Sequence, residues 1–183
     1  MRKKIDYPVA DIRHYLEPGP IVLVTSRWQD EANVMTMGWH TVMEFTPSLV
    51  GCVIAAGNHS FELIRNSREC VINIPTLEMI DTVVDIGNCS GAKVDKFDRF
   101  GLATSPAGKV GAALLDDCFV SLECRIYDDI LIDTYNYFIF EVVQAHAAVS
   151  PKYPQTVHYT GNGDFMTAGK HLSRRGRFIA QNL

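Results

Sequence analysis

Short runs of β-branched and aromatic residues, separated by turn signals, dominate the sequence and limit its fold more than any other feature. They occupy residues 20–26, 33–41, 49–56, 70–74 and, twice, 118–149. A doubly wound α/β fold needs a helix after nearly every strand, and this pattern offers too few helices. We therefore expect a mainly β fold, an antiparallel barrel or sandwich with two or three short peripheral helices, in which the last two runs form a hairpin.

Two segments, 58–67 and 77–86, carry helical patterns. The first begins with Asn58 or Ser60 as a candidate N-cap, and the second ends before Gly87, a residue suited to the C-terminal end of a helix. Both segments are short. We expect them to lie on the periphery of the sheet.

Composition excludes several classes of protein. With 183 residues, 47% of them hydrophobic, the chain can form a core, and we expect a single domain over residues 1–183. A formal net charge of -4 provides no positive field for nucleic acid. No apolar run approaches the ~18 residues of a membrane helix or forms the core of a secretory signal, so we expect a cytoplasmic protein with no membrane partner. The five cysteines contain no CxxC pair, which excludes a zinc knuckle.

A strand that ends in glycine and opens a helix lies at residues 55–64. Unpaired backbone N–H groups and the helix dipole at such a junction suit an anion such as phosphate. Asn58, His59 and Ser60 add side-chain donors. The alternative is that Asn58 or Ser60 only caps the helix.

The run 33–41 mixes polar and apolar residues on both faces of the expected strand. Met35, Met37 and Trp39 alternate along it and can form an apolar wall for a flat heteroaromatic ligand, with Gly38 allowing a close approach of the backbone. The alternative is an ordinary core face.

Other chemical signatures are weak. The loop around Ser90 and Gly91 leads to Lys96, which is either a phosphate contact or a solvated cation. Residues 170–178 form a basic cluster that is either a solvated end, a nucleotide-phosphate contact or a nucleic-acid patch. The sequence has no HExxH metal motif and no G-x-S-x-G elbow.

Several segments resemble, in order, the flavin reductase-like family and in particular its flavoredoxin-type members. The segments are PGPIVLVTS, NVMTMGW, TPSLVGCVIAAGNHSFELI, CVINIP, SGAKVDKF, and FIFEVVQAH with HYTGNGDF. The resemblance covers roughly residues 15–178. It implies an FMN-binding split barrel, an antiparallel Greek-key barrel that forms a homodimer and holds its flavin at or near the subunit interface. An apolar surface that includes Trp39 and the aromatic run 135–140 also favours pairing.

The resemblance further implies a set of cofactor-binding residues. The backbone of residues 35–39 would bond the polar edge of the isoalloxazine ring, residues 56–60 would receive the phosphate, and Lys96 would add a phosphate contact with Phe97 packed nearby. The implied residues are Asn33, Met35, Thr36, Met37, Gly38, Trp39, Thr41, Ala56, Asn58, His59, Ser60, Lys96 and Phe97. Asn58 stands where many relatives have an arginine. His59, Lys96 or the basic tail of a partner subunit can compensate for that charge.

The function implied is that of an oxidoreductase that accepts electrons from NADH or NADPH on bound FMN and passes them to free flavin, a partner protein or a small acceptor. Such an enzyme needs no metal and no catalytic side chain, because the flavin carries the hydride. Two alternatives stay open: a non-catalytic FMN-binding electron carrier, and an enzyme of the pyridoxamine-phosphate-oxidase type with the same fold.

Overall fold

An eight-stranded antiparallel sheet forms the body of the molecule in the computed structural model, which describes residues 3–9, 12 and 19–179. The strands are β1 (Lys4–Tyr7), β2 (Val22–Trp28), β3 (Glu31–Met37), β4 (His40–Glu44), β5 (Leu49–Val53), β6 (Glu69–Ile74), β9 (Val120–Asp128) and β10 (Tyr137–Ala148). They pair in the order β3-β2-β6-β9-β10-β5-β4, and β1 pairs with the end of β10. The predicted mainly β, antiparallel fold is confirmed. The predicted domain, residues 1–183, extends beyond the described ranges at both ends.

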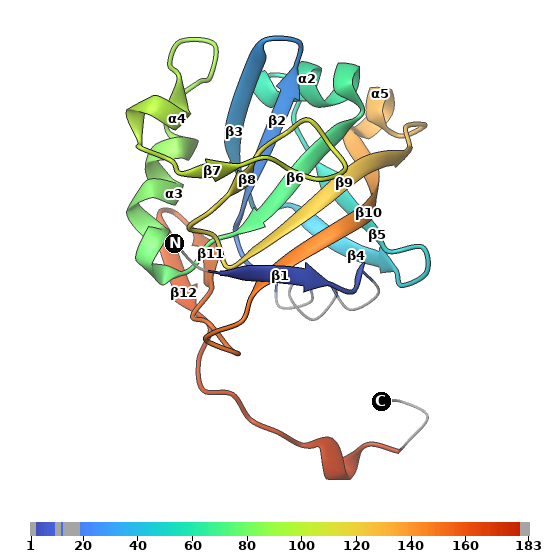
Figure 1. The fold of residues 1–183 in the computed structure, drawn as a ribbon, viewed down its shortest axis with the longest axis vertical. Helices are drawn as coiled ribbons and strands as arrows, with labels where there is room; N and C mark the ends of the chain where they lie inside the picture. The colour runs from blue at the N-terminus through green and yellow to red at the C-terminus, as the bar shows by residue number, and fades with distance from the viewer. Residues whose placement is uncertain (1–2, 10–11, 13–18, 180–183) are drawn as a thin grey trace.

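The two ends of this sheet are strands that follow one another in the chain. β3 pairs with β2 and β4 pairs with β5, so the backbone has to leave one hairpin and enter the other between them. It does so at Gly38 and Trp39, and the Trp39 carbonyl accepts a hydrogen bond from the Val53 N–H at 3.0 Å. The sheet curls on itself so that this junction joins its edges (Figure 1). The prediction of one strand over 33–41 is therefore wrong in extent.

Residues 22–26 of β2 and 33–37 of β3 are largely buried on both faces, which explains the mixed pattern of the run 33–41. Val24 and Met35 point into the interior of the curled sheet, whereas Leu23 and Val34 belong to a second apolar cluster outside it. That outer cluster is covered by α3 (Ile80–Gly87), which contributes Val83 and Ile86.

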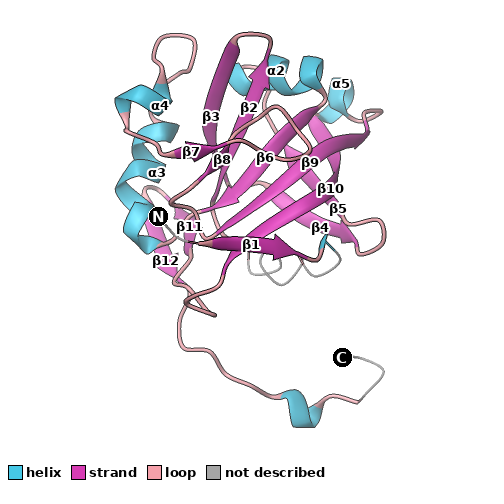
Figure 2. Ribbon diagram, in the orientation of Figure 1, coloured by secondary structure: helices cyan, strands magenta, loops and turns pink. Residues whose placement is uncertain are grey.

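Short helices surround the sheet (Figure 2). Besides α3, the described residues contain α2 (His59–Ser67), α4 (Lys96–Arg99), α5 (Ile132–Tyr135) and the 3-10 turns η2 (Leu77–Met79) and η3 (Arg175–Arg177). Asn58 is the N-cap of α2, and its side-chain oxygen accepts from the Ser60 N–H at 3.0 Å. The predicted helix over 77–86 divides into η2 and α3.

Two small hairpins complete the fold. β7 (Thr104–Ser105) pairs with β8 (Leu114–Leu115), and β11 (Val157–Gly161) pairs with β12 (Asp164–Thr167). The predicted pairing of the last two β runs is confirmed as β9 with β10, although α5 lies in their connection. Among the described helices, none has the length and apolar character needed to cross a membrane.

Candidate functional site

A groove runs along the outer side of β3, between that strand and the end of α3. It consists of two pockets of about 250 Å³ and 450 Å³ that share Thr36, Gly87 and Asn88. We call the smaller one the α2 pocket, because Gly57, Asn58 and His59 at the start of α2 line it, and the larger one the Trp39 pocket. Eight of the predicted residues line the groove: Asn33, Met35, Thr36, Gly38, Trp39, Asn58, His59 and Lys96.

The backbone of β3 is available to a ligand in this groove. β3 is an end strand of the sheet order in the described chain, and it pairs only through the side that faces β2. The Val34 carbonyl is directed the other way, because it accepts from Lys96 Nζ at 2.9 Å. Since backbone groups alternate along a strand, those of Thr36 point the same way as those of Val34. The groove therefore offers a polar strand edge to a planar ligand.

Asn33 supplies an unused acceptor in the α2 pocket. Its side-chain nitrogen donates to Ser60 Oγ at 2.9 Å, which fixes the amide, and Ser60 Oγ also accepts from Ser26 Oγ at 3.1 Å. The side-chain oxygen Oδ1 is buried and has no hydrogen-bond partner within the described structure. A buried polar atom without a partner costs about 1–3 kcal/mol. A ligand hydroxyl that donates to Asn33 Oδ1 removes this cost.

Gly91 makes close contact with Asn33 and His59. A Cβ atom at this position would lie 2.2 Å from Asn33 Oδ1 and 2.7 Å from His59 Cδ2. Both distances are far below van der Waals contact. The loop can approach these side chains only with glycine at position 91.

The two basic side chains of the α2 pocket, Lys96 and His59, both contact other groups of the protein. Lys96 Nζ donates to the carbonyls of Val34 and Ile86, each at 2.9 Å, which leaves one of its three N–H groups. Burial lowers the pKa of Lys96, and the nearby Cys89 acts in the opposite direction. His59 Nε2 lies 2.8 Å from Glu31 Oε1, without the alignment of a hydrogen bond. The pocket thus presents little free positive charge.

The Trp39 pocket has apolar and aromatic walls. The side chain of Trp39 is 74% exposed, and across the pocket Tyr159 and Phe165 come from the β11–β12 hairpin. Val83 and Val84 of α3 form a further side. A planar ring in this pocket would cover apolar surface that is now exposed.

Some predicted residues lie elsewhere. Met37 is buried in the interior of the sheet, so the predicted wall of Met35, Met37 and Trp39 is wrong for Met37. Phe97 lines neither pocket, but it packs in the outer apolar cluster with Val83 and Ile86, which do line the groove. Thr41 on β4 and Ala56 before α2 are exposed and line neither pocket. Ser60 lies behind Asn33 and fixes its orientation.

Sequence reasoning missed the far wall of the groove. Gly87 was expected only at a helix end, and Asn88 was not singled out. Phe165 and Tyr159 belong to the segment HYTGNGDF, to which no site role was given. The aromatic residues of that segment were the signal that could have identified this wall.

A buried acid–histidine pair lies outside the groove. Glu123 is fully buried on β9; it accepts from His146 Nε2 at 2.7 Å and from the backbone N–H groups of Gly108 and Lys109. Burial raises the pKa of Glu123, but these hydrogen bonds outweigh burial and the pKa is lowered. This pair ties the loop before β8 to the sheet. The described residues contain no cluster of side chains suited to a metal ion.

Comparisons with known proteins agree with this architecture. The family model of the flavin reductase like domain matches residues 14–165. The FMN-binding domain of a flavin reductases-like enzyme from Shewanella baltica superposes with a TM-score of 0.87 at 24% identity, covering 94% of this chain and 97% of that one. Flavoredoxin of Desulfovibrio vulgaris gives a TM-score of 0.78 at 20% identity, covering 86% and 90%. FMN reductase (NADH) RutF of Pseudomonas syringae is 25% identical over 103 residues, 56% of this chain and 55% of its own length.

Proposed function

This chain belongs to the flavin reductase-like family, and from that premise we propose that it is an FMN-dependent oxidoreductase formed by a single domain over residues 1–183. The observation that carries the proposal is the groove along β3, which joins a polar pocket at the start of α2 to an aromatic pocket at Trp39. FMN has the same division between a phosphorylated sugar chain and a planar ring.

The residues of the groove fit FMN. The buried Asn33 Oδ1 lacks a donor, and the hydroxyl groups of the ribityl chain are donors. The outward backbone groups of Thr36 are suited to the polar edge of the ring, and Trp39 and Tyr159 to its faces. His59 and the remaining N–H of Lys96 are the groups of this pocket that would meet the phosphate. Asn58 caps α2 and lines the same pocket.

When bound, FMN supplies the redox chemistry: it accepts a hydride from NADH or NADPH and delivers electrons to an acceptor such as free flavin, a partner protein or a small molecule. The chain supplies position and environment. Backbone N–H groups at the strand edge would stabilise negative charge at the polar edge of a bound ring, because their dipoles are already oriented toward it. Tyr159 and Val84 line the opposite side of the pocket, where they would cover part of a bound ring. The name of RutF supports NADH as the donor.

We also propose a homodimer. Trp39, Met43 and Phe45, at and beyond the junction of β3 and β4, are 74%, 43% and 50% exposed. Exposed apolar side chains next to an end strand favour pairing with a second copy, and two-fold symmetry is the most frequent solution. The dimer would cover the Trp39 pocket from outside. The cytoplasmic location stays a prediction.

The test is anaerobic reduction of the purified protein loaded with FMN. We expect one FMN per chain and loss of its yellow absorbance on addition of NADH or NADPH, followed by recovery with an acceptor. Dithionite serves as the positive control for a reducible flavin. A protein that takes up no FMN contradicts the proposal. Reduction by dithionite but not by NADH or NADPH contradicts the enzyme and supports the alternative, a non-catalytic FMN-binding electron carrier.

A further inference from the structure

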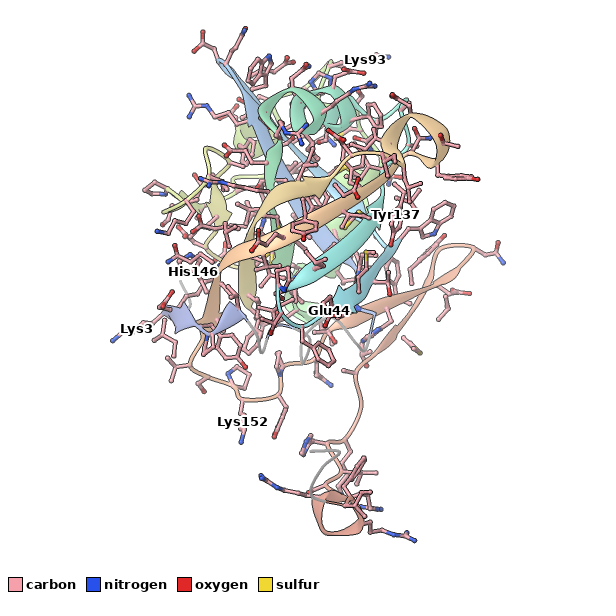
Figure 3. The ribbon with its side chains drawn as sticks, turned by 90° about the vertical axis from the view of Figure 1, so that its right-hand side faces the viewer. Lys3, Glu44, Lys93, Tyr137, His146 and Lys152 are labelled. Atoms are coloured by element: carbon pink, nitrogen blue, oxygen red, sulfur yellow. The ribbon has the colours of Figure 1, made fainter. Side chains whose placement is uncertain are left out.

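The C-terminal segment, residues 168–179, leaves the body of the molecule as an extended arm. Its last backbone hydrogen bond to the body joins the Ala168 N–H to the Thr156 carbonyl at 2.9 Å. Every residue from 169 to 179 is exposed. Figure 1 and Figure 3 show, from two directions, that this C-terminal arm points away from the sheet. Among the described residues its one directional contact with the body is the ring of His171, stacked on Tyr153 at 3.7 Å.

The C-terminal arm combines positive charge with apolar side chains. Its cations are Lys170, Arg174, Arg175 and Arg177, and its large apolar residues Leu172, Phe178 and Ile179 are 63%, 57% and 58% exposed. None of the three arginines is ion-paired with a described residue. Apolar and arginine side chains that their own body leaves uncovered are typical of a segment that binds another surface.

The α2 pocket lacks the charge that the arm carries. A phosphate monoester bears about −1.5 to −2 charges at neutral pH. Of the basic side chains that line the pocket, Lys96 already donates to two carbonyls and His59 lies beside Glu31. The N–H groups of Ser60 and Phe61 in the first turn of α2 are bonded to Asn58. A phosphate in this pocket would therefore be poorly neutralised by the described residues of the same chain.

We infer that the C-terminal arm of one copy completes the phosphate end of the α2 pocket in a second copy. The inference rests on the proposed function, because it takes the phosphate of FMN as the anion. Arginine is suited to the role, since its planar guanidinium binds phosphate oxygens in pairs. A segment of this length spans up to roughly 40 Å when extended, enough to cross to a partner. If each copy places its arm on the other, the two contacts are related by two-fold symmetry and the assembly stops at a dimer.

The first experiment compares FMN with riboflavin, which has the same ring and sugar chain but no phosphate. The variant R174Q/R175Q/R177Q removes the arginine charges of the arm. We expect its Kd for FMN to rise about tenfold or more, as charge-assisted hydrogen bonds are lost, and its Kd for riboflavin to stay unchanged. The matched control R99Q/K109Q/R125Q removes three exposed charges from α4, the loop before β8 and β9, and should leave both affinities unchanged.

The second experiment tests whether the arm acts between copies. A subunit with Gly91→Val has a blocked pocket and an intact arm, whereas the R174Q/R175Q/R177Q subunit has an open pocket and a neutral arm. Co-expressed with two different tags and purified as the mixed dimer, the pair should bind one FMN with wild-type affinity. If the arm serves its own pocket, the mixed dimer binds FMN as weakly as the triple variant, and the exchange is refuted.

The outcomes separate this inference from the proposed function. Wild-type protein that binds neither FMN nor riboflavin contradicts the proposed function itself. Tight FMN binding by wild type and triple variant alike refutes only the role of the arm. Equal loss of FMN and riboflavin in the triple variant also refutes it, because the arginines would then support the fold and not the phosphate.

Discussion

Replacement of Gly91 by alanine tests the geometry of the α2 pocket most directly. The new Cβ would lie 2.2 Å from Asn33 Oδ1, 2.5 Å from its Cγ and 2.7 Å from His59 Cδ2. To restore ordinary contact, Asn33 or the loop has to move by roughly 1 Å. Asn33 cannot move freely, because its side-chain nitrogen is bonded to the buried Ser60 Oγ.

Crowding of this kind costs about 1–3 kcal/mol of folding free energy. At about 2–4 °C per kcal/mol for a chain of this size, Gly91→Ala should lower Tm by about 2–12 °C. It also misplaces the acceptor Asn33 Oδ1, so we expect the Kd for FMN to rise at least about tenfold. Thermal unfolding and fluorescence titration with FMN measure the two effects.

Gly108→Ala is the matched control. Its Cβ would meet Gln144 Oε1 at 3.0 Å, the end of a side chain that can move aside, and it lies away from the groove. Both Tm and FMN affinity should stay close to wild type. If Gly91→Ala behaves like this control, the close packing of the loop on Asn33 is refuted, and with it the assignment of the α2 pocket to the sugar-phosphate part of FMN.

Three further predictions concern the ring site, the acid limit of stability and the core. Trp39→Ala should weaken FMN and riboflavin equally in titrations, and equal affinities in variant and wild type would remove Trp39 from the ring site. The lowered pKa of Glu123 stabilises the fold above the ordinary pKa of glutamate, and this contribution is lost as pH falls through the lowered value. Urea unfolding of Glu123→Gln should therefore show a lower free energy of unfolding at neutral pH and a weaker loss of it as the pH falls. A loss as steep as in the wild type would exclude the Glu123–His146 pair as its cause. Phe138→Ala should cost about 3–5 kcal/mol in the same assay, because the ring is fully buried, and a loss below about 1 kcal/mol would contradict its place in the core.

The β-rich fold followed from local patterns that tertiary packing reinforced. The segment 70–74 is β-branched and lies in the centre of the sheet as part of β6, so pattern and burial agree. Asn58 caps α2, as predicted for an asparagine at the start of a helix. The junction after Met37 was missed, because no local signal shows that β3 and β4 pair with different partners.

The sequence predicted the lining residues of the groove best at the turn before α2. It predicted them less well on β3, where burial determines which side chains reach the groove. Asn58 and His59 lie in the groove, as the turn before α2 predicts. Met37 does not, because its side chain is buried in the interior of the sheet, whereas Met35 in the same cluster still reaches the α2 pocket. The engagement of Lys96 with backbone carbonyls depends on a contact between distant parts of the chain, and no sequence pattern indicates it.

The seam at Gly38 and Trp39 also bears on how the chain folds. The hairpins β2–β3 and β4–β5 join neighbours in sequence, as β9 and β10 do, whereas the pairings β2–β6, β6–β9 and β5–β10 that connect them join distant segments. Distant pairings form slowly, because long loops have to close first. Trp39 therefore lies between two hairpins that can form independently. Its fluorescence during refolding would report the later step in which the two edges of the sheet come together.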